Sequence, residues 1–582
     1  MGEHVTTGEL AKALVRLARR EMSDFANAAP PWRMLVLSGP APSAIRTELE
    51  RLRQGDPARG AALLSHRFTL AGDTLQLAPG DSIWARPAPS RRFAAALHGF
   101  DWLTDLLSVK DAEARQFART LTDDWIEQFG HWNWFAWSPT VTARRLRAWL
   151  AAGPDLLADD DAAAEARRLG ALGRMVRRLR RALPLMENNR DRLHAVTSLA
   201  LAAVSLDLEA GVLKDANAAL GAVLKSQILP DGGHVSRNPQ AAAETLVDLA
   251  VLDEAAARRG VALDAEVRRA LDRLAPFVRF CLITGSDLAA FHGGGEGDSR
   301  AISAALTLCE AGRRSFNVAP HSGYQRASAG GVSVILDGAG PPPGAHAAES
   351  HASALAFEMA TPGGKLVVNC GWSEDQPGSW REPVRATAAH SVLTLEETSS
   401  ARLLQPGWKR RLLGPRVVSG PDPVKARRNE EDMGIWLEAT HDGYRKRFGL
   451  SLRRRLFLAA DGGDLRGEDG LFRPVEDGPP EDPEQRYTFA IRFHLHPEVR
   501  ASLSRDALSA LLVQPNGEGW RFRTDGGTVR LERSVYLAAG APPQRSTQLV
   551  VSGDAEPYGG GDRPPNRVRW AFQRLGRMGS AG

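Results

Sequence analysis

Residues 317–338 read NVAPHSGYQRASAGGVSVILDG, and the spacing of the apolar residues changes within this stretch. Before it, apolar residues recur every three or four positions, which is typical of helices. After it, apolar and polar residues alternate, which is typical of half-buried strands. Because an all-helical segment followed by an all-β segment usually forms separate domains, the sequence predicts two. We place their boundary so that the domains are 1–313 and 314–582.

Helical patterns fill the N-terminal half of the chain. The clearest ones are found at residues 1–25, 111–129, 192–211, 241–260 and 263–283. Helices recur in pairs roughly every 45 to 50 residues, which is the spacing of stacked helical hairpins. Their apolar stripes are broad, so each helix is expected to pack on more than one neighbour. A solenoid or a ring of helical hairpins is therefore expected.

Strand patterns fill the C-terminal half, and glycine-rich turns separate them. They are found at residues 330–338, 364–371, 390–398, 450–460, 487–497, 510–524 and 528–538. This arrangement predicts an antiparallel β-sandwich, so that the whole chain belongs to the α+β multidomain class. The charged, proline-containing stretch 420–434 is interpreted as a surface loop.

Composition excludes several classes of protein. The net charge of +5 suits an anionic partner, but no base-reading motif accompanies it, so nucleic acid is not expected. No run of about 18 apolar residues occurs, so no membrane span is predicted. Cys281, Cys309 and Cys370 are far apart in apolar surroundings and read as buried free thiols. The first 25 residues lack the apolar core of a signal peptide, so a cytoplasmic location is expected.

Four strings of sequence carry a resemblance to a known family. They are ILPDGGHVSRNPQ (228–240), SHASALAFEM (350–359), WREPVRATAAHSVLTLEETSSA (380–401) and RFHLHPEV (492–499). Together they resemble the bacterial heparinase II/III-like proteins. The resemblance implies an incomplete α/α toroid followed by a β-sandwich. It also implies a carbon–oxygen lyase that cleaves an acidic, uronate-containing glycan, with the periplasm or cell envelope as the alternative location.

The chemistry implied by the resemblance needs three kinds of side chain. A donor must neutralise the sugar carboxylate, a base must remove the proton beside it, and an acid must protonate the leaving oxygen. No organic cofactor is required. An acidic poly- or oligosaccharide would lie in a cleft between the toroid mouth and the sandwich.

We select the candidate residues mainly from strings of the kind that carry the resemblance and from the domain junction. The predicted catalytic residues are His234, Tyr324, Glu349 and His351. The predicted substrate-binding residues are Asn188, Asn189, Arg190, Arg237, His292 and Arg326. Amide, imidazole and guanidinium groups are donors that suit a carboxylate.

The family's tyrosine base is missing from its usual place. The family has this tyrosine shortly after a segment like DGGHVSRNP, but Gln240 and two alanines follow here. All five tyrosines lie beyond residue 320, so Tyr324 is the nearest candidate. Its alternative role is packing between the domains. His234 is the alternative base or the group that neutralises the substrate carboxylate.

Other candidates also have structural alternatives. Asparagine is common at helix N-caps, which is the alternative for Asn188 and Asn189. Arg237 has the alternative of bonding carbonyl groups at a helix end. His292 lies in a glycine-rich stretch before a helix, which we interpret as a loop lining the cleft.

A zinc site is the remaining hypothesis drawn from the resemblance. The family pattern puts its catalytic histidine on Glu349 and its metal ligands on His351, Asn369 and His390. Zinc accepts imidazole well and a neutral amide poorly, so only two good ligands remain. The alternative is a histidine–asparagine hydrogen-bond network that ties strands together, and we prefer it.

Three functions follow from these observations. The first is a polysaccharide lyase, the second a catalytically altered glycan-binding protein, and the third a helical scaffold for protein contacts. Residues 441–458 alternate basic and apolar side chains, so one face of this hairpin is cationic. That face is either simply solvated or a surface for an acidic glycan. The sequence leaves the oligomeric state open.

Overall fold

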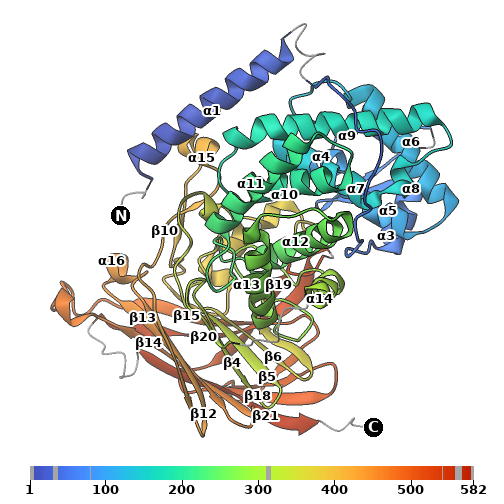
Figure 1. The fold of residues 1–582 in the computed structure, drawn as a ribbon. Coiled ribbons are helices and arrows are strands. Elements are labelled where there is room, and N and C mark those ends of the chain that lie inside the picture. Colours follow the sequence, from blue (N-terminus) through green and yellow to red (C-terminus); the bar gives the residue numbers. More distant parts are fainter. Residues whose placement is uncertain are drawn as a thin grey trace.

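The computed structural model describes residues 5–29, 37–78, 80–309, 316–540, 542–557 and 566–577. Figure 1 shows a helical N-terminal part packed against a C-terminal part made of sheets. The predicted α+β architecture is thereby confirmed. The predicted boundary between residues 313 and 314 lies outside the described residues.

The helical part consists mainly of antiparallel helices joined by short loops. Its helices are α1 (Thr7–Ala28), α3 (Pro57–Leu64), α4 (Arg91–Gly99), α5 (Leu103–Ser108), α6 (Ala112–Phe129), α7 (Pro139–Ala152), α8 (Pro154–Leu157), α9 (Ala162–Ala182), α10 (Arg190–Ser205), α11 (Ala210–Gln227), α12 (Pro239–Arg259), α13 (Ala265–Cys281) and α14 (Ser299–Leu308). A small hairpin of β1 (Arg67–Leu70) and β2 (Asp73–Gln76) lies among them.

Alternate helices form an inner row. Helices α4, α7, α10, α12 and α14 contact one another in turn, while α6 packs on α9 and α11 on α13. Helix α10 is buried at every residue from Ala195 to Ser205, because it has neighbours on all sides. A helix in that position carries apolar residues around its whole circumference, which is the broad stripe visible in the sequence.

The predicted helix 192–211 is in fact two helices. Helix α10 ends at Ser205, and α11 begins at Ala210. The break is stabilised from far away in the sequence: the Asp207 carboxylate accepts hydrogen bonds from Ser43 and Arg46. The sequence around Asp207 does not indicate a hydrogen-bond partner that lies more than 160 residues away, so this helix end was not predicted.

Two antiparallel sheets make up the C-terminal part. One runs in the order β11 (Lys425–Glu431), β12 (Gly434–His441), β13 (Ser451–Ala459), β14 (Asp464–Phe472), β21 (Arg567–Arg577), β18 (Glu518–Thr524), β17 (Ser509–Val513) and β16 (Arg500–Leu503). The other runs β19 (Val529–Tyr536), β20 (Gln544–Ala555), β15 (Tyr487–Leu495), β7 (Gly364–Val368), β6 (Phe357–Thr361), β5 (Val332–Asp337), β4 (Tyr324–Ala329) and β3 (Val318–Ala319), with β8 (Leu393–Leu395) also on β15.

Shorter elements connect these strands. They are the pair β9 (Arg402–Leu403) and β10 (Val417–Ser419), and the helices α15 (Trp408–Leu413) and α16 (Arg445–Phe448). Helix α1 packs on α15, and its Asp24 also pairs with Arg178 of α9 at 3.0 Å (Figure 1).

The predicted loop at 420–434 is wrong in its main part. Residues 425–431 form β11, which pairs along its whole length with β12. Strand β11 lies at the edge of its sheet, and its side chains are exposed or half-exposed on both faces. A strand without a buried face has no reason to alternate apolar and polar residues, so the usual signal is missing.

Aromatic side chains fill the space between the sheets. Phe357 of one sheet stacks on Trp570 of the other with ring centroids 5.6 Å apart, and Phe493 meets Trp570 edge-on at 4.7 Å. Cys281 and Cys370 are buried free thiols as predicted, whereas Cys309 is only partly buried. Among the described helices, none is long and apolar enough to cross a membrane.

Candidate functional site

The candidate residues gather where the helical part meets the sandwich. The N-terminal ends of α10 and α12 face the segment before β6, and the glycine-rich loop 291–297 packs between them. At Gly293, with φ +81°, a Cβ atom would lie 2.9 Å from the Glu349 carbonyl oxygen. A glycine is therefore needed for this close approach. We call this region the junction.

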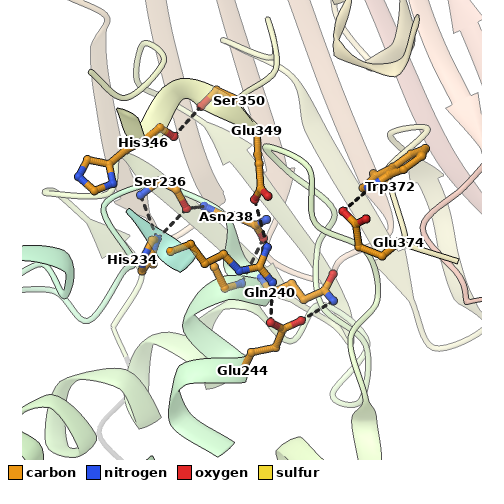
Figure 2. Close-up of polar contacts among 12 residues, drawn as sticks. His234, Ser236, Asn238, Gln240, Glu244, His346, Glu349, Ser350, Trp372 and Glu374 are labelled. Atoms are coloured by element: carbon orange, nitrogen blue, oxygen red, sulfur yellow. Dashed lines mark hydrogen bonds and ion pairs between the residues drawn. The ribbon is translucent and has the colours of Figure 1, made fainter. Parts of the chain in front are cut away.

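Arg190 is the centre of the junction. Its Nη2 donates to Glu244 Oε2 at 2.5 Å, and its Nη1 donates to Glu349 Oε2 at 3.1 Å. Figure 2 shows Glu244 on its helix and Glu349 on the opposing segment, facing each other across the gap. The side chains of Arg190 and Glu349 are 32% and 30% exposed, so the pair is open to solvent. Two of the chain's own carboxylates thus occupy the arginine that we predicted for a substrate carboxylate.

Further charged side chains of the junction come from loops of the sandwich. Arg381 lies 3.7 Å from Glu349 and 3.3 Å from Glu374, whose Oε1 also accepts a hydrogen bond from Trp372. Glu244 is held on its other side by Gln240. Burial would raise the pKa of Glu244, but the charge and hydrogen bond of Arg190, together with the charges of Arg53 and Arg147, outweigh burial and lower that pKa to about 2. Glu244 is therefore ionised at neutral pH.

His234 lies beside the junction but has no access to it. Its side chain is buried, with Nδ1 2.7 Å from Ser236 Oγ and Nε2 3.0 Å from Gln227 Oε1. Burial lowers the pKa of His234 to about 3. Both ring nitrogens are engaged, so the structure gives His234 a structural role in place of the predicted base. The turn depends on Gly232, whose Cβ would lie 1.9 Å from the Arg273 carbonyl oxygen.

Arg237 ties the two parts of the chain together. Its guanidinium forms a buried ion pair with Asp337 of β5, and Nε donates to the Ser322 carbonyl at 2.7 Å. Asp337 also accepts a hydrogen bond from Ser353 at 2.7 Å and lies 3.2 Å from His292 Nε2. The predicted roles of Arg237 as a substrate clamp and of His292 as a cleft residue are therefore wrong, because both side chains are sealed in this network.

Electrostatics favour the charged form of this network. Burial would raise the pKa of Asp337, but Arg237 and His292 outweigh that effect and hold it below its ordinary value. Burial lowers the pKa of His292, so its imidazole stays neutral. A buried carboxylate with an arginine and two hydrogen-bond partners is stable in place, whereas removing one partner leaves an uncompensated charge.

Tyr324 and Arg326 are also structural. The Tyr324 hydroxyl donates to the Arg237 carbonyl oxygen at 2.5 Å and is fully buried. Burial raises the pKa of this phenol well above its ordinary value, which disfavours the phenolate that a base requires. Arg326 donates to the carbonyl oxygens of Phe280 and Leu282 at the end of α13. The alternative of packing between the domains is the one that the structure supports for Tyr324.

Asn188 and Asn189 both make structural hydrogen bonds, but with different partners. Asn189 is the N-cap of α10, and its side chain accepts a hydrogen bond from the Arg192 amide at 3.2 Å, as in the structural alternative. Asn188 bonds Ser226 and Gln227 of α11. Neither side chain is directed by these contacts toward the junction.

The residues proposed for zinc do not form a suitable set of ligands. His351 and His390 are buried with ring centroids 5.2 Å apart, and burial lowers the pKa of His390 to about 3. Asn369 is engaged elsewhere: its Nδ2 donates to Glu358, and its Oδ1 accepts from the Ser391 amide. Among the described residues, no three or more His, Cys, Asp or Glu side chains are grouped to hold a metal ion. Two imidazoles alone do not fit zinc.

The preferred alternative, a hydrogen-bond network between histidine and asparagine, is also wrong, because these residues do not bond each other. Neither ring nitrogen of His390 has a hydrogen-bond partner within the described part of the chain, and Asn369 bonds a carboxylate in place of a histidine. The strands are tied together through Glu358 and Asn369, and Glu358 was not predicted. Its carboxyl group is buried, which raises its pKa to about 7.

Sequence reasoning missed Gln240, Glu244, Arg381 and Glu374. A signal did exist for the first two: Gln240, Glu244 and Asp248 follow at intervals of four in the part of α12 before Asp253, which is otherwise apolar except for Thr245. That spacing places them on one face, so a polar stripe along α12 was predictable. Arg381 and Glu374 come from loops, and their position depends on the fold alone.

The fold and the junction define a class of protein, namely a helical toroid and β-sandwich of the heparinase III type. A solved heparinase III matches with TM-score 0.66 and 13% identity over 98% of this chain and 92% of that one. The heparan sulfate lyase HepC from Pedobacter heparinus matches with TM-score 0.54 and 12% identity over 98% and 92%. Identities this low establish a common fold only.

Sequence comparisons establish the family. The profile "Heparinase II/III-like, C-terminal" matches residues 311–571. FtsZ-localized protein C from Caulobacter vibrioides is 36% identical over 543 residues, which cover 93% of this chain and 92% of that protein. The chain belongs to the heparinase II/III-like family, as the resemblance implied.

Proposed function

We propose that this chain is a glycan-binding member of the family that does not carry out β-elimination. The observation that supports the proposal is the state of Arg190, which is already paired with Glu244 and Glu349. A uronate carboxylate would have to displace one of them. In addition, Glu349 is an anion at the position where the family pattern has a catalytic histidine, so it repels the substrate carboxylate.

The candidate general bases also argue against β-elimination. His234 and Tyr324 are buried, and each makes hydrogen bonds within the protein. A general base must come within hydrogen-bond distance of the proton that it removes. Neither side chain can do so without local unfolding. An acidic saccharide as ligand is supported by the basic net charge and by the fold shared with a heparan sulfate lyase.

Two measurements on the same samples test the proposal. The protein is incubated with heparan sulfate, polygalacturonate and alginate, and the ultraviolet absorbance of the unsaturated product is followed. A glycan array of acidic and neutral saccharides then measures binding. We expect no unsaturated product and retained binding to acidic saccharides. Formation of the unsaturated product from any of the polymers contradicts the proposal. So does an array on which the protein binds none of the acidic saccharides.

A second function is favoured by the sequence relative. Because the similarity to FtsZ-localized protein C covers 93% of the chain, we propose that this chain also localises with FtsZ. We propose a cytoplasmic location as part of this second function. The toroid would then also serve protein contacts.

Fluorescence microscopy tests this second function. A fluorescent fusion is expressed in Caulobacter vibrioides that carries labelled FtsZ and lacks its own FtsZ-localized protein C. We expect the two signals to coincide and to disperse together when FtsZ is depleted. A diffuse signal in cells with intact FtsZ structures would contradict the proposal.

A further inference from the structure

The outer face of the sheet that begins with β11 carries an ordered row of side chains. Strand register places Trp436 of β12 opposite Phe457 of β13, and Phe457 opposite Arg466 of β14. Ala571 of β21 lies opposite both Arg466 and Arg523 of β18. The row therefore crosses five strands in the order aromatic, aromatic, arginine, alanine, arginine. Figure 1 shows these strands on the side of the sandwich away from the helices.

A groove runs along this row. The groove has a volume of about 590 Å³ and is lined by Trp436, Arg455, Arg466, Arg523, Arg569 and Ala571, among others. Ala571 is small, so it leaves space between Arg466 and Arg523, whose strands are two apart and thus separated by about 10 Å. The groove lies on the sandwich and includes no residue of the junction.

The aromatic end of the groove is partly open. Trp436 is 40% exposed, and its ring centroid lies 4.7 Å from that of Phe457. The guanidinium of Arg466 lies over the Phe457 ring at 5.9 Å. An exposed tryptophan supported from one side presents a flat apolar surface, on which the apolar face of a sugar ring can pack.

The charged end has an excess of positive charge. Four arginines line the groove, but only two carboxylates do, Glu468 and Asp525. Arg455 and Arg569 approach Glu468 at 3.4 and 3.2 Å, and Arg455 also pairs with Glu438 beside the groove at 2.8 Å. Arg466 pairs with Asp464 at 2.7 Å, whereas no carboxylate pairs with Arg523 in the part of the chain that the structure describes. The groove is thus suited to an anion that guanidinium groups bind through paired hydrogen bonds.

We propose that this groove binds an acidic saccharide, with a sugar ring on Trp436 and a carboxylate or sulfate group between Arg466 and Arg523. A nucleic acid is less suited, because an excess of two charges is small for a phosphate polymer. The inference rests on the proposed function only for the chemical class of the ligand. It assigns a second site, on the face of the sandwich remote from Arg190.

Isothermal titration calorimetry with a heparin hexasaccharide tests the site, with maltohexaose as the uncharged counterpart. The variants are Trp436→Ala and Arg523→Ser, both at exposed side chains, where folding is expected to tolerate the change. Arg500→Ser is the matched control, because Arg500 is exposed on β16 of the same sheet and lies outside the groove. We expect each groove variant to weaken hexasaccharide binding by about tenfold, as one charge-assisted or aromatic contact is lost. The control should bind like the wild type, and maltohexaose should not bind.

Other outcomes overturn the inference in distinguishable ways. If hexasaccharide binding is lost in Arg190→Gln and unchanged in both groove variants, the saccharide site is at the junction, and the proposed function remains. If single-stranded DNA binds more tightly than the hexasaccharide and depends on Arg523, the groove is a nucleic-acid site. If the wild type binds no acidic saccharide, the inference and the proposed function both fail. Circular dichroism and urea unfolding confirm that each variant is folded.

Discussion

Arg190, the first residue of α10, donates a hydrogen bond to Glu349 across the junction, with Nη1 3.1 Å from Oε2. One partner comes from the toroid and the other from the segment that leads into β6 of the sandwich. The pair therefore connects the two parts of the chain through groups that are about one-third exposed. A carboxylate of the protein occupies the arginine that a uronate would need.

Releasing Arg190 is expected to create a carboxylate site at the junction. In Glu349→Gln the negative charge is removed, so we expect galacturonate oligomers to bind about tenfold more tightly, as for one charge-assisted contact. Calorimetry in an Arg523→Ser background separates this effect from the groove. Glu382→Gln is the control, because Glu382 pairs with Arg410 and lies outside the Arg190 contacts. Equal affinity in both variants would contradict the assignment.

Breaking the buried pair of Arg237 and Asp337 is expected to destabilise the fold strongly. Asp337→Asn leaves Arg237 buried without its counter-charge, which costs about 3 to 5 kcal/mol. The free energy of unfolding in urea measures the loss. Asp272→Asn removes an exposed partner of Arg268 and should change stability by no more than about 0.5 kcal/mol. A loss of similar size in the two variants would refute the structural role of the buried pair.

Glu358 is expected to make stability fall as pH rises. Its pKa is about 7 in the folded protein, whereas an exposed glutamate has a pKa near 4.5. Between these values the folded state binds more protons than the unfolded state, so the contribution is fully present below about pH 4.5 and is lost through pH 7. The loss amounts to about 3 kcal/mol.

Urea unfolding between pH 5 and pH 8 measures this contribution as the difference between the wild type and Glu358→Gln. Glutamine cannot ionise, so stability of the variant should fall less across this range. The buried histidines affect both proteins equally and cancel in the comparison. Parallel stability curves for the two proteins would exclude a raised pKa at Glu358.

Zinc is expected to leave thermal stability unchanged. His351 and His390 provide two imidazoles, and Asn369 is held by Glu358 and Ser391, so a ligand set for tight binding is missing. A metal that binds the folded state raises the melting temperature by an amount that grows with the logarithm of its concentration divided by its Kd. Differential scanning calorimetry with zinc and with a chelator should therefore give the same Tm. An increase that disappears in His390→Ala would reveal a metal site.

Some features of the fold were predictable because they depend on neighbours in the sequence. Helix α12 was placed within two residues at its start, and it ends at Arg259, directly before Gly260, which adopts the left-handed conformation with φ +67°. Strand β13 alternates buried and less buried residues, and its period-two pattern was visible in advance. Strand β11 was missed because an edge strand exposed on both faces has no such pattern.

The candidate site was predictable in location more than in roles. Three of the predicted residues do lie near one another, because Arg190 pairs with Glu349 and its charge acts on the buried His234. Whether a histidine is a base or a buried structural group depends on its solvent access and hydrogen-bond partners. For His234 those partners are Ser236 nearby and Gln227 on another helix, and only the packing of α11 determines the second.

The sequence by itself determined the α+β class, several of the helices and strands, the family and the lack of a tyrosine in the helical half, because these follow from local spacing and residue identity. The tertiary structure decided which charges meet. Glu244 and Glu349 are more than 100 residues apart, yet they share one guanidinium. Trp436 and Arg523 reach one groove only through the order of strands in the sheet. Such pairs depend on chain topology, and topology is set by the packing of the whole core.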